Sequence, residues 1–218
     1  ELNQNPFLIE FLNYEKVEKS KAFLQTEFSI KENKDITFRN IEIRENNNKF
    51  KIENIFLYND LKIIKLNKID LDYIDKDNKE NLIKVSRSKN TYNLIGTSFN
   101  ADNLITKALN SDENQRELFK EDFDLNIKID NIFFDENNEL KNLKGNLNIK
   151  NNKLNFVKLN SNFSNNEKFI LSIKFEKDQK ITNFLSEKAE PLVRRYKFIK
   201  GFKKGKMEFY SKKIGNKS

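Results

Sequence analysis

The sequence feature that most constrains the fold is the alternation of apolar and polar residues along much of the chain. It is clearest within residues 123–150, where Leu125 is followed by Asn126 and Ile127 by Lys128. Successive side chains of a β-strand point to opposite faces of a sheet, so such a run has one apolar face and one polar face. The pattern therefore predicts half-buried β-strands.

Similar alternating runs recur roughly every ten residues, the spacing expected of consecutive antiparallel strands. Turns rich in Asn, Asp and Lys separate them, and Asn tolerates the left-handed backbone that tight turns require. The alternation slips by one residue at 39–40 and again at 53–54, where we expect β-bulges. The runs comprise residues 22–30, 36–43, 50–57, 69–73, 82–85, 92–96, 125–129, 147–149, 154–159 and 169–175.

Two segments depart from this alternation and predict helices. Residues 98–119 begin with polar capping residues and continue with apolar residues at helical spacing. Residues 181–199 also indicate a helix, with Pro191 in the first turn of its second part, where the missing N–H costs nothing. Residues 6–16 are a candidate third helix. The predicted fold is mainly β with two or three short helices, and the apolar face of the sheet needs a cover: a second sheet, these helices, or a ligand.

The composition lacks the residues that catalytic and metal sites use most often. The chain has no Cys and no His, so disulfides, thiolate metal sites and the commonest general base are absent. Acidic pairs such as Asp70 and Asp72 are expected on any solvated strand face. Residues 75–82 lack the Gly and Glu of a calcium loop and indicate a hairpin turn instead. We therefore expect neither an enzyme nor a cofactor-binding protein.

The net charge of +8 comes mainly from lysines spread along the chain, which is typical of a solvated surface. In residues 194–206, however, basic and aromatic residues interleave. Such a stretch can complement a helix C-terminus, contact anionic lipid headgroups or bind single-stranded nucleic acid. RNA-recognition signatures are absent, so no nucleic acid is expected. The candidate headgroup contacts are Arg194, Arg195, Lys197, Lys200, Lys203 and Lys204.

Targeting signals are not found in this sequence. No run approaches the ~18 apolar residues needed to cross a bilayer. The first residues lack the basic start and cleavage site of a signal peptide. We expect the sequence to be an internal or C-terminal fragment of a longer protein.

The order of elements resembles the C-terminal region of the AsmA-like family, of the YhdP and TamB type. That family has a G-x-S-F-D-A step from strand to helix, strands that read L-x-N-L-x-G-x-L, and a later helix leading into a G-G-x-L strand. The match is best over residues 90–211, and residues 22–90 follow it only in style. Asn100 stands where the family commonly has Asp, and 188–190 depart from an Asp-Ala-Gly-like step. The matching residues are Gly96, Ser98, Phe99, Ala101, Leu140, Leu143, Gly145, Leu147, Gly201, Gly205 and Met207.

The resemblance implies that residues 1–218 form a single β-rich region, an extended and curled antiparallel sheet with an apolar groove. It also implies a periplasmic protein anchored in the inner membrane of a Gram-negative bacterium by an N-terminal helix absent from this sequence. Phospholipid is then the expected partner, in transport to the outer membrane and envelope integrity. The expected groove lining is Leu125, Ile127, Ile129, Leu147, Ile149, Leu171, Ile173 and Phe175.

Two other functions remain open. The first is a structural or scaffolding β-domain whose apolar face is closed by its own helices and which acts through protein partners of the cell envelope. The second, less expected, is a basic nucleic-acid-binding module.

Overall fold

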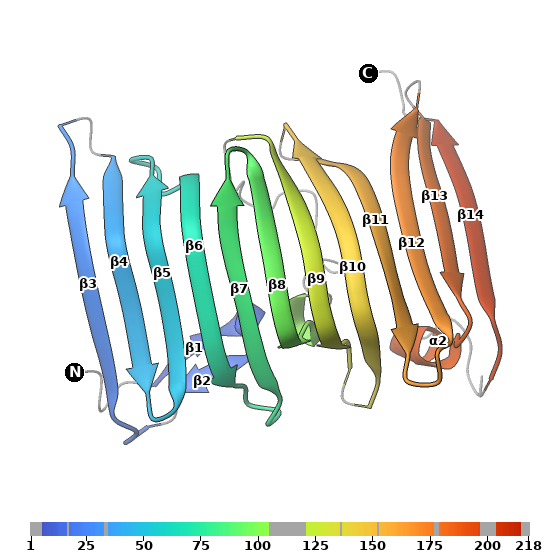
Figure 1. Cartoon of the computed structure of the whole chain (residues 1–218), viewed down its shortest axis with the longest axis horizontal. Helices are drawn as coiled ribbons and strands as arrows, with labels where there is room; N and C mark the ends of the chain where they lie inside the picture. Colours follow the sequence, from blue (N-terminus) through green and yellow to red (C-terminus); the bar gives the residue numbers. More distant parts are fainter. Residues whose placement is uncertain are drawn as a thin grey trace.

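One open β-sheet dominates the structure. A computed structural model of the chain describes residues 6–16, 18–32, 35–104, 121–135, 137–151, 153–176, 179–196 and 204–214. Within these residues a 12-stranded sheet places strands β3 to β14 side by side in chain order (Figure 1). The sheet is not closed into a barrel, because β3 and β14 lie at opposite edges. The prediction of a mainly β, antiparallel fold is confirmed.

Each alternating run of the sequence lies within one strand of this sheet. Hairpin turns join most consecutive strands. The turn predicted at residues 75–82 is found at 75–79, between β6 and β7, and residues 80–82 already belong to β7. The strands are β3 (Ala22–Ile30), β4 (Ile36–Glu45), β5 (Asn48–Leu57), β6 (Ile63–Ile74), β7 (Glu80–Ser88), β8 (Thr91–Asn100), β9 (Phe123–Phe133), β10 (Glu139–Lys150), β11 (Lys153–Phe163), β12 (Lys168–Glu176), β13 (Gln179–Ser186) and β14 (Met207–Ile214).

Asparagines provide most of the left-handed backbone. The side chain of asparagine is short and polar, so a positive φ costs Asn less than it costs most other residues. Tight loops begin with such residues: Asn46 after β4, Lys89 after β7 and Asn151 after β10. Of the residues predicted to form the turns, Asn, Asp and Lys, this confirms Asn and Lys at these positions. The asparagines with positive φ are Asn13, Asn46, Asn54, Asn78, Asn142, Asn151 and Asn166.

The two slips in the alternation have different structural origins. Arg39 is an extra residue in β4, because Glu27 pairs with Asn40 while Phe28 pairs with Phe38. The first predicted bulge is therefore confirmed. At the second slip the register between β4 and β5 is continuous, and Asn54, with φ 53°, reverses the alternation instead.

One strand pair departs from the antiparallel prediction. β8 and β9 are parallel, so the chain must return to the opposite end of the sheet between residues 101 and 122, and parallel pairs need such a crossover. The predicted helix at 98–119 is wrong for 98–100, which belong to β8. A helical turn follows at 102–104, where the Asn100 side chain accepts a hydrogen bond from the Asp102 N–H at 3.2 Å. Residues 105–119 lie outside the described residues.

The other two predicted helices are wrong in part. Residues 6–16 form β1 (Phe7–Ile9), a 3-10 turn η1 (Glu10–Leu12) and β2 (Tyr14–Lys16), because Asn13 turns left-handed and ends the helical turn. Residues 181–186 belong to β13, where pairing to β12 overrides their helical spacing. Among the residues described, only the second part is helical, as α2 (Glu190–Tyr196), and Pro191 does lie in its first turn. Residues 197–199 of the predicted helix lie outside the described residues.

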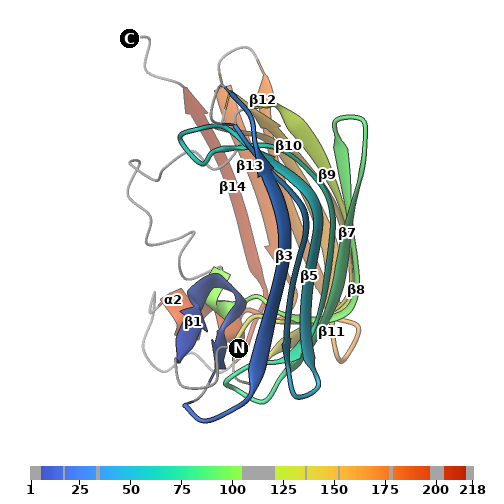
Figure 2. The same cartoon turned by 90° about the vertical axis from the view of Figure 1, so that its left-hand side faces the viewer.

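The sheet is curled, and its small elements lie on the concave side. Figure 2 shows the strands curving around the β1–β2 hairpin and α2, both near one end of the strands. The Tyr14 ring of the hairpin lies 4.5 Å from the Phe50 ring of β5 and 5.8 Å from the Tyr73 ring of β6. Phe50 therefore marks the concave face of the sheet.

Candidate functional site

A continuous row of residues crosses the concave face from one edge of the sheet to the other. Residues opposite each other in adjacent strands share a face, and Ile52 shares that of Phe50, two positions away in β5. Following the pairs from Ile52 in both directions gives one residue in each strand. All but Thr26 and Gly145 are apolar. This central row is Thr26, Ile41, Ile52, Ile69, Val85, Leu94, Ile127, Gly145, Leu159, Leu171, Phe184 and Phe209.

Gly145 does not interrupt the apolar surface of the central row. The Leu159 side chain of the neighbouring strand lies over it, and a Cβ there would also come within 2.9 Å of the Lys158 carbonyl oxygen. Gly96 is covered in the same way by Ile83, at 2.7 Å from such a Cβ. In both places a neighbouring side chain fills the space that the glycine leaves open.

The central row is half-buried from β4 to β13. Its side chains contact one another laterally, but they are not sealed as a closed core is. By contrast, the row nearer the hairpin is closed: Phe50 is 5% exposed, Ile83 5% and Ile129 2%. The concave face thus has a closed rim along one end of the strands and a more open apolar surface beside it.

Aromatic packing builds the closed rim. Tyr14, Phe50 and Tyr73 form a cluster in which the Phe50 and Tyr73 rings are 4.9 Å apart. The Tyr73 hydroxyl donates to the Leu12 carbonyl at 2.9 Å, and the Tyr14 hydroxyl donates to Glu45. Burial raises the pKa of both phenols, and nearby carboxylates, Glu45 for Tyr14 and Asp75 for Tyr73, raise it further. Both tyrosines are therefore held neutral.

A buried polar network ties the hairpin to the sheet. The Asn100 side chain donates to Asp75 at 2.7 Å, and the Asn100 N–H donates to Asn81 at 2.7 Å. Asn103 reaches the hairpin by donating to Asn13 at 2.7 Å. The network joins the β6–β7 turn, the end of β8 and η1, so it holds the β1–β2 hairpin in place over the closed rim.

The convex face is mostly polar, although Ile74 and Ile95 are exposed on it. The Asn126 side chain donates to Asn93 at 2.9 Å, and Asn146 donates to Asn126 at 2.7 Å, so amides link three adjacent strands. Elsewhere opposite charges face each other across strands, as in the pairing of Lys51 with Asp70. The sheet therefore has an apolar concave face and a solvated convex face.

The predicted lining residues all lie on the concave face. Leu125 is opposite Leu147, and Ile173 is opposite Val157. Their exposure differs: Ile129, at 2% exposed, belongs to the closed rim, and Phe175 is 47% exposed. The half-buried residues between these extremes are Leu125, Ile127, Leu147, Ile149, Leu171 and Ile173.

The predicted basic contacts fall mostly outside the described residues. Lys197, Lys200 and Lys203 are not described, and Arg194 and Arg195 are described only as backbone in α2. Lys204 is exposed.

The sequence-based list missed the half of the face that β4 to β8 contribute. Ile52, Ile69 and Leu94 occupy the same central row as Ile127. Their alternation was visible in the sequence, so that signal could have found them. Phe184 was missed for another reason, because its segment was predicted to be helical.

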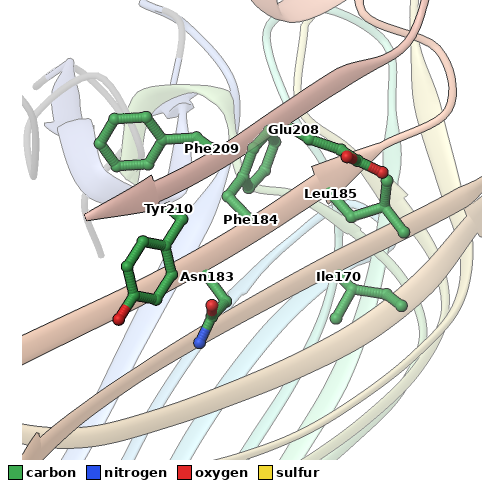
Figure 3. Close-up of a pocket in the computed structure, with 7 residues that line it drawn as sticks. All are labelled: Ile170, Asn183, Phe184, Leu185, Glu208, Phe209 and Tyr210. Carbon is green, nitrogen blue, oxygen red and sulfur yellow. The ribbon is translucent and has the colours of Figure 1, made fainter. Parts of the chain in front are cut away.

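A surface pocket of about 370 Å³ lies at the β14 edge of the sheet. In Figure 3, Phe184 and Phe209 project to one side of the ribbon and Asn183 and Tyr210 to the other. Ile170, Leu185 and Glu208 complete its lining. The pocket therefore straddles the edge of the sheet and is not an enclosed site.

Two other kinds of site were sought in the part of the chain that the structure describes. No group of three or more Asp and Glu side chains there is arranged to hold a metal ion. None of the helices there has the length and apolar character needed to span a bilayer.

Comparisons of the chain with protein-family models, with curated proteins and with solved structures found no match.

Proposed function

We propose that this chain is a segment of a periplasmic, inner-membrane-anchored AsmA-like protein that holds phospholipid acyl chains on its concave face and takes part in lipid transport to the outer membrane. The observation that supports the proposal best is the central row, which is apolar in all strands except β3 and β10 and runs unbroken between two open edges.

The physical basis is the cost of exposing hydrocarbon to water. Covering an acyl chain gains about 0.8 kcal/mol for each buried CH₂ group. Half-buried Ile, Leu and Phe side chains offer such a cover without hydrogen bonds or charges, so lipids of different headgroup can share it. The headgroups stay in water beyond the open side of the face.

The concave face is long enough to hold an acyl chain. Strands lie about 4.8 Å apart, so twelve of them make a trough about 50 Å long. One leaflet of a bilayer is about 15 Å of hydrocarbon, half of the ~30 Å core. An acyl chain lying across the strands therefore fits within the trough, and lipids can follow one another along it.

A scaffolding domain is the second candidate. The β1–β2 hairpin already closes one rim of the concave face, with Tyr14 only 1% exposed. If the whole face served to pack against protein, the purified chain would carry no lipid.

Photocrosslinking at adjacent positions separates the two functions. A photoreactive amino acid in place of Ile127 lies on the concave face, and one in place of Lys128 lies on the convex face of the same strand. With vesicles of phosphatidylethanolamine and phosphatidylglycerol, position 127 should label acyl chains and position 128 should not. Leu94 and Asn93 give a second matched pair in β8.

Equal labelling at positions 127 and 128 would contradict the proposal. A lipid-free preparation with no crosslink at either Ile127 or Leu94 would favour the scaffolding domain.

A further inference from the structure

The edge strand β3 is unusually exposed and unprotected. Eight of its nine residues, all after Ala22, are exposed, and it pairs only with β4 among the described strands. Its large apolar side chains are 48% to 61% exposed: Phe23, Leu24, Phe28 and Ile30. Natural edges usually carry lysines, prolines or bulges that prevent further pairing.

β3 has none of these devices. Its only charged residue is Glu27, no residue in it has positive φ, and the bulge beside it lies in β4. The opposite edge differs, because β14 carries Lys212 and Lys213. Of the two edge strands that the structure describes, β3 is therefore the unprotected one, and the row of backbone N–H and C=O groups that it does not use with β4 is a template for another strand.

We propose that β3 pairs with β3 of a second copy of this chain, antiparallel and with Thr26 on the two-fold axis. In this register Leu24 faces Phe28 of the second copy on the concave side. Gln25 faces Glu27 on the convex side, where the amide can donate to the carboxylate. Beside the axis, apolar residues therefore face apolar residues and polar residues face polar residues.

The charge pattern selects this register over its neighbours. A shift of two residues in one direction places Glu27 opposite Glu27, and like charges directly opposite are destabilising. A shift in the other direction places Gln25 opposite itself and Phe23 opposite Glu27. Two-fold dimers are also the commonest assemblies of identical chains, and a two-fold axis perpendicular to the sheet makes the pairing of β3 with its own copy antiparallel. The inference rests on the edge strand and not on lipid binding.

Cysteine crosslinking tests the register directly, because the chain contains no native Cys. Thr26→Cys brings two thiols together across the axis and should give a disulfide-linked dimer under mild oxidation. A mixture of Gln25→Cys and Glu27→Cys chains should give the mixed dimer. Ser211→Cys, at the β14 edge, is the matched control and should give no disulfide-linked dimer.

The oligomeric state tests the interface without crosslinking. The wild-type chain should be dimeric in sedimentation equilibrium, and Thr26→Lys should raise the dimer dissociation constant about two- to fivefold by opposing two like charges. Ser211→Lys should leave it unchanged. Thr26→Lys should remain folded, because Thr26 is exposed.

A wild-type chain that sediments as a monomer would overturn the inference. So would a dimer that is unaffected by Thr26→Lys, or one that crosslinks through Ser211→Cys in place of Thr26→Cys.

Discussion

At the residue scale, Tyr73 should make the stability of the fold sensitive to alkaline pH. Its pKa is raised above the ordinary value of about 10, so folding favours the neutral phenol. Its contribution is fully present below about pH 10 and is lost as the pH rises, because the unfolded chain then releases a proton that the folded chain retains. The free energy of unfolding of the wild type should therefore fall above about pH 10.

Tyr73→Phe should weaken this fall. The variant should also lose about 1 kcal/mol near neutral pH, because the hydrogen bond to the Leu12 carbonyl is removed. Urea denaturation at a series of pH values measures both effects. Tyr210→Phe removes an exposed hydroxyl and should leave the free energy of unfolding near neutral pH unchanged. Parallel pH profiles for Tyr73→Phe and the wild type would contradict the prediction.

Single residues of the turns could be predicted from the sequence better than those of the strands. Asn46 and Asn151 follow apolar runs, so their left-handed turns were expected. Asn54 and Asn142 adopt the same left-handed conformation inside strands. There the pairing with the two neighbouring strands decides which residue takes a positive φ, so the sequence alone does not show it. The burial of Lys16 and Glu45 at the rim was also unpredictable, because it depends on where the hairpin docks.

At the element scale, Asn100 should contribute strongly to the free energy of unfolding, because it links the elements at the closed rim. Its side chain bonds Asp75 and accepts from the Asp102 N–H. Asn100→Ala should cost about 1–3 kcal/mol, because it leaves buried polar groups without partners. Asn93→Ala removes one amide of the solvated ladder and should change stability by less than about 0.5 kcal/mol. Equal losses of unfolding free energy in urea for the two variants would refute the distinction.

The elements themselves were predictable where local pattern and pairing agree. The strand at 22–30 was predicted with the bounds that the structure has. Residues 181–186 fit both a helix and a strand locally, and the edge of β12 decided between them. The parallel pairing of β8 with β9 had no local signal in the sequence. It depends on how two strands separated by a long connection pair, and not on the residues within either strand.

At the scale of the whole molecule, half of the candidate site could be predicted. Ile127 and Leu171 were identified as lining residues, and they lie in the central row. The contribution of β4 to β8 and the closed rim were not foreseen, since alternation tells which residues share a face but not what covers it. Ile127 is half-buried and Ile129, two positions along the strand, is fully buried in the cluster that includes Tyr14 of the hairpin.

The central row should work as a unit, so one charge within it should affect lipid binding. Leu171→Glu places a carboxylate on the concave face between Leu159 and Phe184. An acyl chain could cover that position only by desolvating the charge, which is far more costly than the burial it gains. Copurifying phospholipid, measured by mass spectrometry, should fall several-fold.

The same charge one residue along, in Ser172→Glu, lies on the polar convex face and should leave the bound lipid unchanged. Circular dichroism and urea denaturation check that both variants remain folded. Equal lipid content in the two folded variants would mean that the concave face does not hold the lipid.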